Sequence, residues 1–125
     1  MTHGEGRYPR PTPVTAYGGG GFRFADMSHR GSILCLPSGV HAWDVVCFED
    51  VSVESLQRPL AELTLRGVLL LGTGETQAWP DEAIVRAFAN AGVGLEIMST
   101  GAAARTYNVL LAEGRNVGAA LIAVS

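Results

Sequence analysis

Residues 67–98, GVLLLGTGETQAWPDEAIVRAFANAGVGLEIM, decide the fold class of this chain. The apolar run at Gly67–Leu71 is typical of a strand that is buried on both faces, as in a parallel sheet covered by helices. Pro80–Asn90 predicts a helix, because proline and two acidic residues open it and Gly92 follows its end. Gly94–Met98 is the next predicted strand. A strand, a helix and a second strand in this order predict a right-handed crossover in a parallel sheet.

The same alternation continues beyond this stretch. Gly101–Glu113 is rich in alanine and leucine and is followed by Gly114, so it predicts the longest helix. Val117–Val124 predicts the last strand. The second half of the chain is therefore an α/β unit with a parallel or mostly parallel sheet.

The first half has a different pattern, in which short apolar runs are separated by turn residues. The predicted strands are Val14–Tyr17, Phe22–Phe24, Ser32–Leu36 and Val40–Phe48. The predicted turns between them are Gly18–Gly21, Asp26–Gly31 and Pro37–Gly39. Such close spacing indicates an antiparallel β meander. A short, irregular helix that is capped by Ser52 or Ser55, contains Pro59 and ends near Leu63 should connect the meander to the α/β unit.

The composition indicates one domain. The chain has 125 residues, of which 47% are apolar and 17% charged, so it has the apolar surface for a core and is not a disordered polar chain. We predict a single domain over residues 14–125 and a flexible tail over residues 1–13, whose three prolines favour extended backbone. The net charge of −3 provides no basic surplus for phosphates, so we expect no nucleic-acid partner.

We also expect no insertion into a membrane. The longest apolar run near the centre, Val68–Leu71, is far shorter than the roughly 20 residues of a spanning helix. Residues 1–13 lack the apolar core of a signal peptide. These features predict a cytoplasmic location, in which Cys35 and Cys47 stay reduced.

No pattern of residues points to catalysis or to metal binding. The histidines His3, His29 and His41 lack the spacing of metal ligands, and no G-x-S-x-G nucleophile turn is present. Cys35 and Cys47 lie within apolar runs, so both are predicted to be inert core residues. We therefore predict no catalytic residue, no metal and no cofactor, and a binding role is favoured over an enzyme.

Apolar side chains at helix and strand spacing predict the core. The predicted core residues are Leu69, Leu71, Ile84, Phe88, Ile97, Leu110 and Leu121. Val85 is predicted to extend the apolar stripe of its helix, and Tyr107 to face the sheet. Trp43 and Trp79 are predicted to be core or interface anchors.

A turn with two glycines follows the GVLLL strand directly. Gly72-Thr73-Gly74 lies beyond the carboxyl end of a buried strand, where ligands bind in open α/β sheets. It is not a dinucleotide fingerprint, because Gln77 stands where the third glycine is required. A tight turn that needs a positive φ is the structural alternative.

Arg105 lies in the first turn of a predicted helix, where the macrodipole disfavours a cation unless a negative group compensates. We predict that Arg105 lies close to the Gly72–Thr76 loop and either pairs with an internal carboxylate or helps to hold a small anion. Glu75 is the preferred internal partner, and Glu96 and Asp81 are alternatives. The predicted binding set is Gly72, Thr73, Gly74, Arg105, Thr106 and Asn108.

Two blocks of sequence resemble a known family. The first is Gly72-Thr73-Gly74 after an apolar strand, and the second is Met98-x-Thr100-x-Ala102-Ala103-x-Arg105-Thr106-Tyr107-Asn108-x-Leu110-x-x-Glu113-x-Arg115-x-Val117. The Gly-x-Phe-x-Phe segment at residues 20–24 and Trp43 also look like the first half of that family. Over residues 14–124, the chain resembles the domain of unknown function 498 family, which includes the mitochondrial complex I assembly factor three and the adipogenesis-associated domain proteins.

The resemblance implies a three-layer α/β domain, in which a β meander or hairpin element packs with a central mixed sheet and helices lie on the far side. It also implies a protein partner, so a protein-interaction module in respiratory complex assembly is the predicted function. The alternative is a small-molecule or anion-binding protein with its site at the Gly72–Thr76 loop and the Arg105–Asn108 helix start. Ser99 departs from the family, which commonly has an acid there, so an Arg105 that relied on that acid must find another partner.

Overall fold

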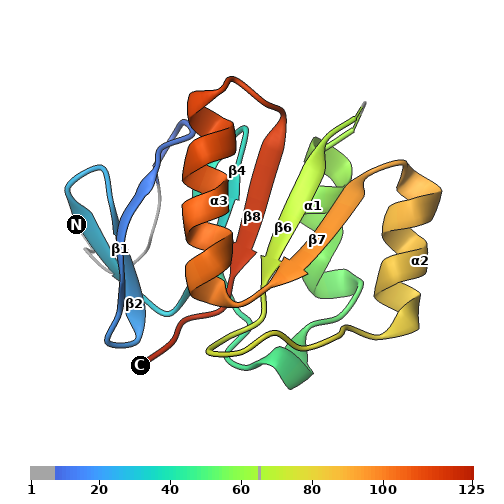
Figure 1. Ribbon diagram of the computed structural model, residues 1–125, viewed down its shortest axis with the longest axis horizontal. Coiled ribbons are helices and arrows are strands. Elements are labelled where there is room, and N and C mark those ends of the chain that lie inside the picture. Colours follow the sequence, from blue (N-terminus) through green and yellow to red (C-terminus); the bar gives the residue numbers. More distant parts are fainter. Residues whose placement is uncertain (1–7, 65) are drawn as a thin grey trace.

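The structure, a computed structural model, describes residues 8–64 and 66–125, which form two β-sheets and the helices around them (Figure 1). Strands β1–β3 make a three-stranded sheet, and the remaining strands make a five-stranded sheet in the order β5-β4-β8-β6-β7. This arrangement confirms the predicted α/β class. It also confirms the parallel unit in the second half and an antiparallel meander at the start of the chain, but the predicted strands at Ser32–Leu36 and after Val40 belong to the five-stranded sheet instead of that meander.

The three-stranded sheet is an antiparallel meander of β1 (Val14–Gly18), β2 (Gly21–Phe24) and β3 (Met27–Arg30). The predicted turn over Asp26–Gly31 is wrong, because the turn shrinks to Ala25 and Asp26, both at positive φ. Two such residues close a tight hairpin that matches the twist of its strands. The strand was missed because three of its four residues, Ser28, His29 and Arg30, are polar.

The five-stranded sheet combines a parallel and an antiparallel part. The strands β6 (Val68–Gly72), β7 (Gly94–Met98) and β8 (Val117–Leu121) are parallel, as predicted. The strand β4 (Ser32–Leu36) pairs antiparallel with β8, and β5 (Gly39–Trp43) pairs antiparallel with β4 at the edge of the sheet. All residues of β4 and β8 are buried, which explains their uninterrupted apolar sequence.

The strand β5 ends at Trp43, so its predicted extension to Phe48 is wrong. Trp43 pairs with Ser32, the first residue of β4, and beyond this pair β5 has no neighbouring strand to bond. The chain leaves the sheet there and enters the short 3-10 helices η2 (Phe48–Asp50) and η3 (Glu54–Leu56). As a consequence Cys47 is exposed, against the prediction, whereas Cys35 in β4 is buried as predicted.

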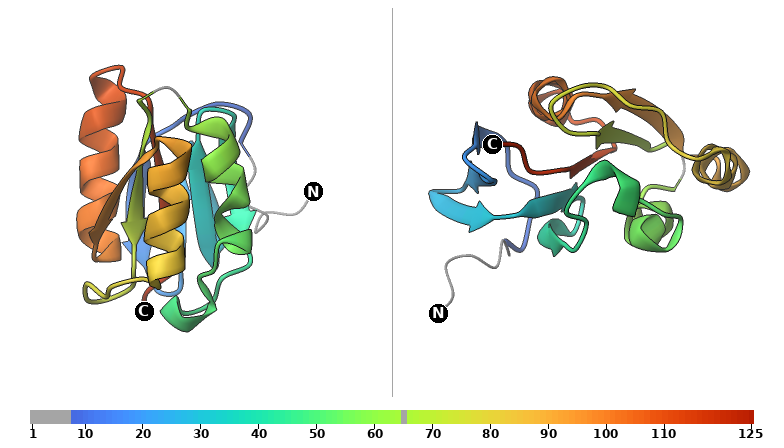
Figure 2. Two further views of the ribbon diagram at one scale, coloured as in Figure 1. Left: turned by 90° about the vertical axis from the view of Figure 1, so that its right-hand side faces the viewer. Right: turned by 90° about the horizontal axis from the view of Figure 1, so that it is seen from below.

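Helices cover both faces of the five-stranded sheet (Figure 2). The longest helix, α3 (Thr100–Ala112), packs with β6 and β8 on one face, beside the three-stranded sheet. The helices α1 (Gln57–Glu62) and α2 (Glu82–Ala91) pack on the opposite face. The far-side helices implied by the family resemblance are therefore α1 and α2, and α3 shares the near face with the meander.

Each face of the sheet has its own apolar core. Tyr107 and Phe24 lie in the cluster under α3, which joins the two sheets. The other cluster contains the predicted core residues Leu69, Leu71, Ile84 and Phe88, each at most 2% exposed. Leu121 is buried in the first cluster, whereas Ile97 and Leu110 are only partly buried and Val85 is 43% exposed.

Residues 1–7 of the predicted tail lie outside the described residues. Tyr8 forms an isolated bridge with Val40, in which the two residues exchange backbone hydrogen bonds of 2.9 and 3.0 Å. The first regular element is β1, which begins at Val14.

Candidate functional site

The glycine turn after β6 is hydrogen-bonded to the start of α3. The Gly74 amide donates to Thr100 Oγ1 (3.0 Å), and the Thr100 amide donates to the Gly74 carbonyl (2.8 Å). A Cβ on Gly72 would lie 2.9 Å from Thr100 Cα, so the close approach of the turn requires glycine there. Gly74 has a φ of 118°. Both glycines therefore have structural reasons, and the positive-φ alternative is confirmed for Gly74.

Thr73 closes the same loop from within. Its side chain is buried, and its Oγ1 donates to the carbonyl of Thr76 (2.7 Å) and accepts from the amide of Ala78 (3.0 Å). At the loop's other side, Gln77 Nε2 donates to the carbonyl of Ile97 in β7 (2.8 Å). These bonds use the polar groups of the loop internally rather than offering them to a ligand.

Arg105 does not pair with Glu75, so that prediction is wrong. Arg105 Nη1 donates to the hydroxyl of Tyr17 in β1 (3.2 Å), and Glu75 accepts instead from Ser125 Oγ (3.0 Å). Within residues 8–64 and 66–125, Arg105 has no carboxylate within ion-pair distance. The helix places Arg105 toward the meander, whereas the glycine loop contacts the first residue of α3. Ser99, which departs from the family, caps α3 by accepting from the Ala102 amide (3.4 Å).

Asn108 joins α3 to the meander. Its Oδ1 accepts from the Val14 amide (2.9 Å), and its Nδ2 donates to the Val14 carbonyl (2.8 Å). Thr106 is half-buried on the same helix. The predicted binding set thus divides in two: the glycine loop bonds to Thr100, and Arg105 and Asn108 bond to β1. These contacts stabilise the fold and give the anion-binding alternative no support.

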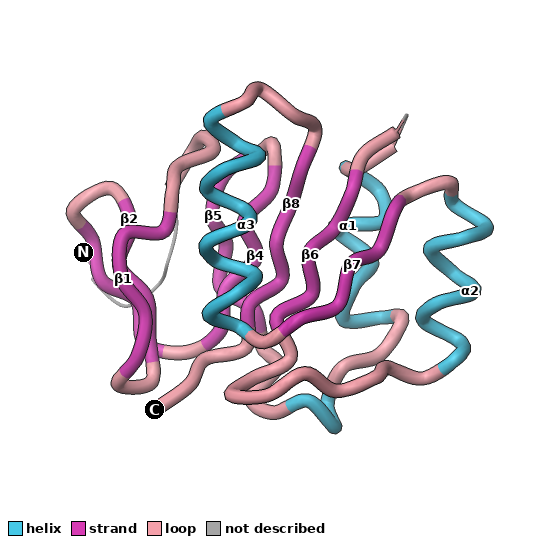
Figure 3. Tube along the Cα trace, viewed as in Figure 1, coloured by secondary structure: helices cyan, strands magenta, loops and turns pink. Residues whose placement is uncertain are grey.

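A different surface, at the carboxyl ends of the parallel strands, was missed. Residues 44–56 leave β5 and residues 73–82 leave β6, and both segments run along the same end of the sheet (Figures 1 and 3). We call the surface formed by these two segments the acidic edge. Its acidic residues are Asp44, Glu49, Asp50, Glu54, Glu75, Asp81 and Glu82. They are all exposed, they are seven of the chain's 12 acidic residues, and neither segment contains lysine or arginine.

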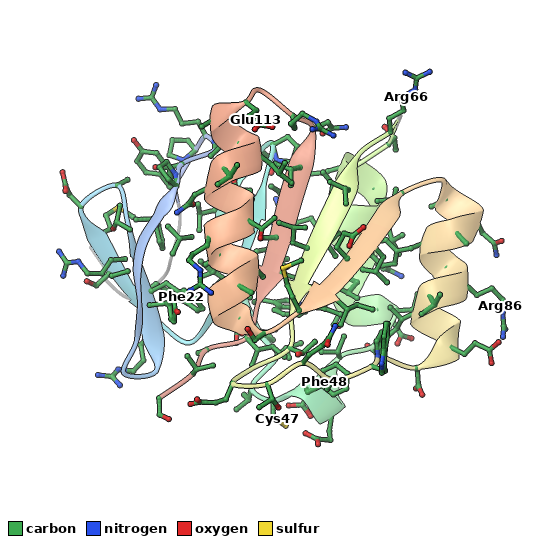
Figure 4. The ribbon with its side chains drawn as sticks, viewed as in Figure 1. Phe22, Cys47, Phe48, Arg66, Arg86 and Glu113 are labelled. Carbon is green, nitrogen blue, oxygen red and sulfur yellow. The ribbon has the colours of Figure 1, made fainter. Side chains whose placement is uncertain are left out.

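Exposed apolar side chains lie on the same acidic edge. Val46 is 77% exposed and Trp79 is 74% exposed, more than any other large apolar side chain among the described residues. Phe48 and Cys47 lie at this end of the molecule, whereas Glu113 and Arg66 lie at the opposite end (Figure 4). The predicted anchor role of Trp43 in the core is confirmed, since it is 7% exposed.

The carboxylates of the acidic edge change the pKa of the exposed Cys47 thiol. Its Sγ donates to Asp50 Oδ2 (3.5 Å). Hydrogen bonding to Glu49 chiefly, and the hydrogen bond and charge of Asp50 in addition, raise the pKa of the Cys47 thiol. The carboxylates therefore hold this thiol in its protonated form, which is the less nucleophilic one.

Comparisons with known proteins agree with this fold. A family model described as "Protein of unknown function (DUF498/DUF598)" matches residues 14–122. This chain belongs to that family. The resemblance drawn from the glycine turn and from the start and body of α3 is thereby confirmed.

Members of the DUF498 family resemble the chain over most of its length. An uncharacterized protein of Rhodobacter capsulatus is 39% identical over 110 residues, which cover 88% of this chain and 83% of that protein. NADH dehydrogenase (ubiquinone) 1 alpha subcomplex assembly factor 3 of Mus musculus is 28% identical over 123 residues, which cover 94% of this chain. The matched region is 64% of the mouse protein, so this chain spans less than two thirds of that relative.

A solved structure of this fold is described as an outer membrane protein from Bartonella henselae. It is 47% identical, has a TM-score of 0.90 and matches 94% of this chain and 99% of that chain. Over the residues that the structure describes, no helix is both long enough and apolar enough to cross a bilayer.

Proposed function

We propose that this chain is a protein-interaction module that helps to assemble a respiratory complex of the NADH dehydrogenase type. The observation that carries the proposal is the extent of the match to the assembly factor, which covers 94% of this chain. A match of this extent involves both sheets and the helices, so the acting unit of the proposal is the single domain of residues 14–125.

The surface supports a protein partner over a small ligand. Val46 and Trp79 expose apolar area on one edge, and exposed apolar area of this kind is typical of protein interaction sites. The glycine turn and the Arg105–Asn108 segment, in contrast, form hydrogen bonds with other residues of the same chain.

The experiment is affinity purification of the tagged chain from its native cells at native abundance, after mild cross-linking. We expect enrichment of subunits or precursors of an NADH dehydrogenase complex over a tagged, unrelated protein of equal abundance. Deletion of the gene should also lower the amount of the assembled complex on a native gel. An unchanged amount of complex together with no enriched subunit would refute the assembly role.

The proposal keeps the cytoplasmic location that the sequence predicts. Cell fractionation tests it, with a salt wash to remove peripheral proteins. Recovery of the chain in the washed membrane fraction would contradict this part of the proposal without touching the interaction role.

A further inference from the structure

We propose that the acidic edge docks a basic segment of a partner protein, with Trp79 and Val46 as its apolar anchors. The carboxylates on the same two segments would pair with lysine or arginine side chains of that partner. This inference rests on the proposed function, because it names the surface and the chemistry of the partner for the same protein-binding role.

Trp79 lies on a loop that is ordered by hydrogen bonds. The loop that carries it is bonded through Thr73 to Ala78 and through Gln77 to Ile97, immediately before the tryptophan. Pro80 follows and restricts the backbone of Trp79 to extended conformations. A partner therefore meets a tryptophan on an ordered loop, which lowers the entropic cost of binding. Tryptophans that become buried in an interface are over-represented among the residues that dominate binding energy.

Val46 is presented by a segment that is tied down on both sides. Its neighbour Val45 is buried, so the next side chain points outward. Further along, Ser52 and Ser55 exchange backbone-to-side-chain hydrogen bonds of 2.9 and 3.1 Å. Trp43 Nε1 also donates to the Ser55 carbonyl (2.8 Å), which fastens the segment to the end of β5. The exposed valine is thus part of a defined surface.

The charge of the acidic edge selects the partner. Seven exposed carboxylates lie on the same two segments as the two anchors, and neither segment contains lysine or arginine. Arg86 pairs with Glu82 (3.3 Å), and Arg30 shares with Asp44 the lining of a groove of about 490 Å³. The remaining carboxylates repel nucleic acid and anionic lipid, and they attract a basic peptide.

A basic side chain also suits the exposed tryptophan. An arginine guanidinium or a lysine ammonium over the ring gains a cation–π interaction, and the aliphatic stem of either residue covers apolar surface. A second copy of this chain is the weaker occupant, because each copy has a net charge of −3 and two copies therefore repel each other. The partner is therefore a segment that combines cationic and apolar side chains.

The test measures binding of the full chain to fluorescein-labelled peptides by anisotropy at low and at moderate salt. The probe is a peptide of alternating leucine and arginine, and the comparison peptides replace arginine by glutamate or leucine by glycine. We expect the leucine–arginine peptide to bind most tightly and its affinity to fall as salt rises. Equal binding of the glutamate peptide would overturn the proposal.

Matched variants locate the binding site. Trp79→Ala should weaken binding of the leucine–arginine peptide about tenfold, and Asp81→Asn about threefold. The controls are Val109→Ala, an exposed apolar residue on α3, and Glu113→Gln, an exposed acid at the opposite end. Both controls should change the affinity less than twofold, and melting curves verify that all four variants fold. Controls that weaken binding as much as Trp79→Ala would overturn the proposal.

A purification from native cells separates this proposal from the assembly role. If NADH dehydrogenase subunits co-purify equally with the wild type and with Trp79→Ala, the docking surface is refuted and the assembly role stands. If no such subunit co-purifies but the peptide binds in a Trp79-dependent manner, the assembly role is refuted and the docking surface stands. Self-association that Trp79→Ala abolishes would assign the acidic edge to a second copy and overturn the basic partner.

Discussion

Replacement of Asn108 by alanine removes the two hydrogen bonds that join α3 to β1. The Asn108 side chain both accepts from the amide and donates to the carbonyl of Val14, at 2.9 and 2.8 Å. Val14 is only 5% exposed, so water reaches its backbone poorly when the asparagine is gone. The meander would then keep its apolar contacts with α3 but lose its polar attachment at the first residue of β1.

The magnitude follows from the two orphaned backbone groups. A buried donor or acceptor that loses its partner costs about 1–3 kcal/mol, and the lower end applies here because Asn108 itself is half-buried. Two groups therefore cost roughly 2–4 kcal/mol. Alanine returns about 0.6 kcal/mol through its higher helix propensity. We expect Asn108→Ala to lower the free energy of unfolding by about 2–3 kcal/mol.

Urea unfolding followed by circular dichroism measures this loss. With a slope of about 1–3 kcal/mol per molar urea, a loss of about 2–3 kcal/mol should lower the midpoint by about 0.7–3 M. The control is Thr106→Ala, two positions away on the same helix, which should move the midpoint far less. Amide hydrogen exchange adds a local readout, because the Val14 amide should lose protection in Asn108→Ala. Equal midpoints for the two variants, or an unchanged Val14 amide, would refute the structural role of Asn108.

Four further outcomes test other parts of the structure. Gly101→Ala should displace the Tyr17 side chain, because the new Cβ would overlap the Tyr17 hydroxyl. Since Tyr17 is 41% exposed and can move, and alanine favours the helix over glycine, a thermal melt should show a change in the free energy of unfolding below about 1 kcal/mol. A maleimide should label the exposed Cys47 but leave the buried Cys35 untouched in the native protein. Because nearby carboxylates raise the pKa of the Cys47 thiol, its labelling should be slower than that of a free cysteine and should accelerate as the pH rises. Burial raises the pKa of Cys35 from 9.0 to about 12. The stability that this thiol contributes is therefore complete below pH 9 and is lost as the pH rises toward 12. By pH 10 the free energy of unfolding, measured with urea, should fall by about 1 kcal/mol more in the wild type than in Cys35→Ala. Phosphate or sulfate should shift the melting temperatures of the wild type and of Arg105→Ala equally, and a larger shift in the wild type would restore the anion site.

Regular elements with a continuous local signal were predictable from the sequence. The apolar run that became β6 and the capped apolar stripe of α2 carry their own structural information, because burial on both faces or on one helical face leaves a periodic pattern. The glycine turn was also predicted from the sequence, although the two positions require glycine for different reasons. Gly74 needs its positive φ, a local property, whereas Gly72 needs the nearness of Thr100.

The misplaced features depend on neighbours that lie far away in the chain. The end of β5 is set by where β4 begins, so no pattern within residues 44–48 reveals it. Burial of Cys47 was predicted from its apolar neighbours, and it failed for the same reason. Arg105 was assigned to Glu75 because both lie near the carboxyl edge, yet the orientation of α3 turns the arginine toward Tyr17. An ion pair depends on side-chain direction, which the order of elements does not specify.

By itself, the sequence determined the α/β class, the order of strands and helices in the second half, part of the core and the family, because each leaves a local periodicity or a contiguous motif. Only the tertiary structure decided which residues meet. It brought Asn108 to Val14 across 94 positions of sequence, and it gathered two acidic segments with Trp79 and Val46 at one end of the sheet. The physical reason is that a surface is assembled from segments whose separation in sequence carries no record of their distance in space.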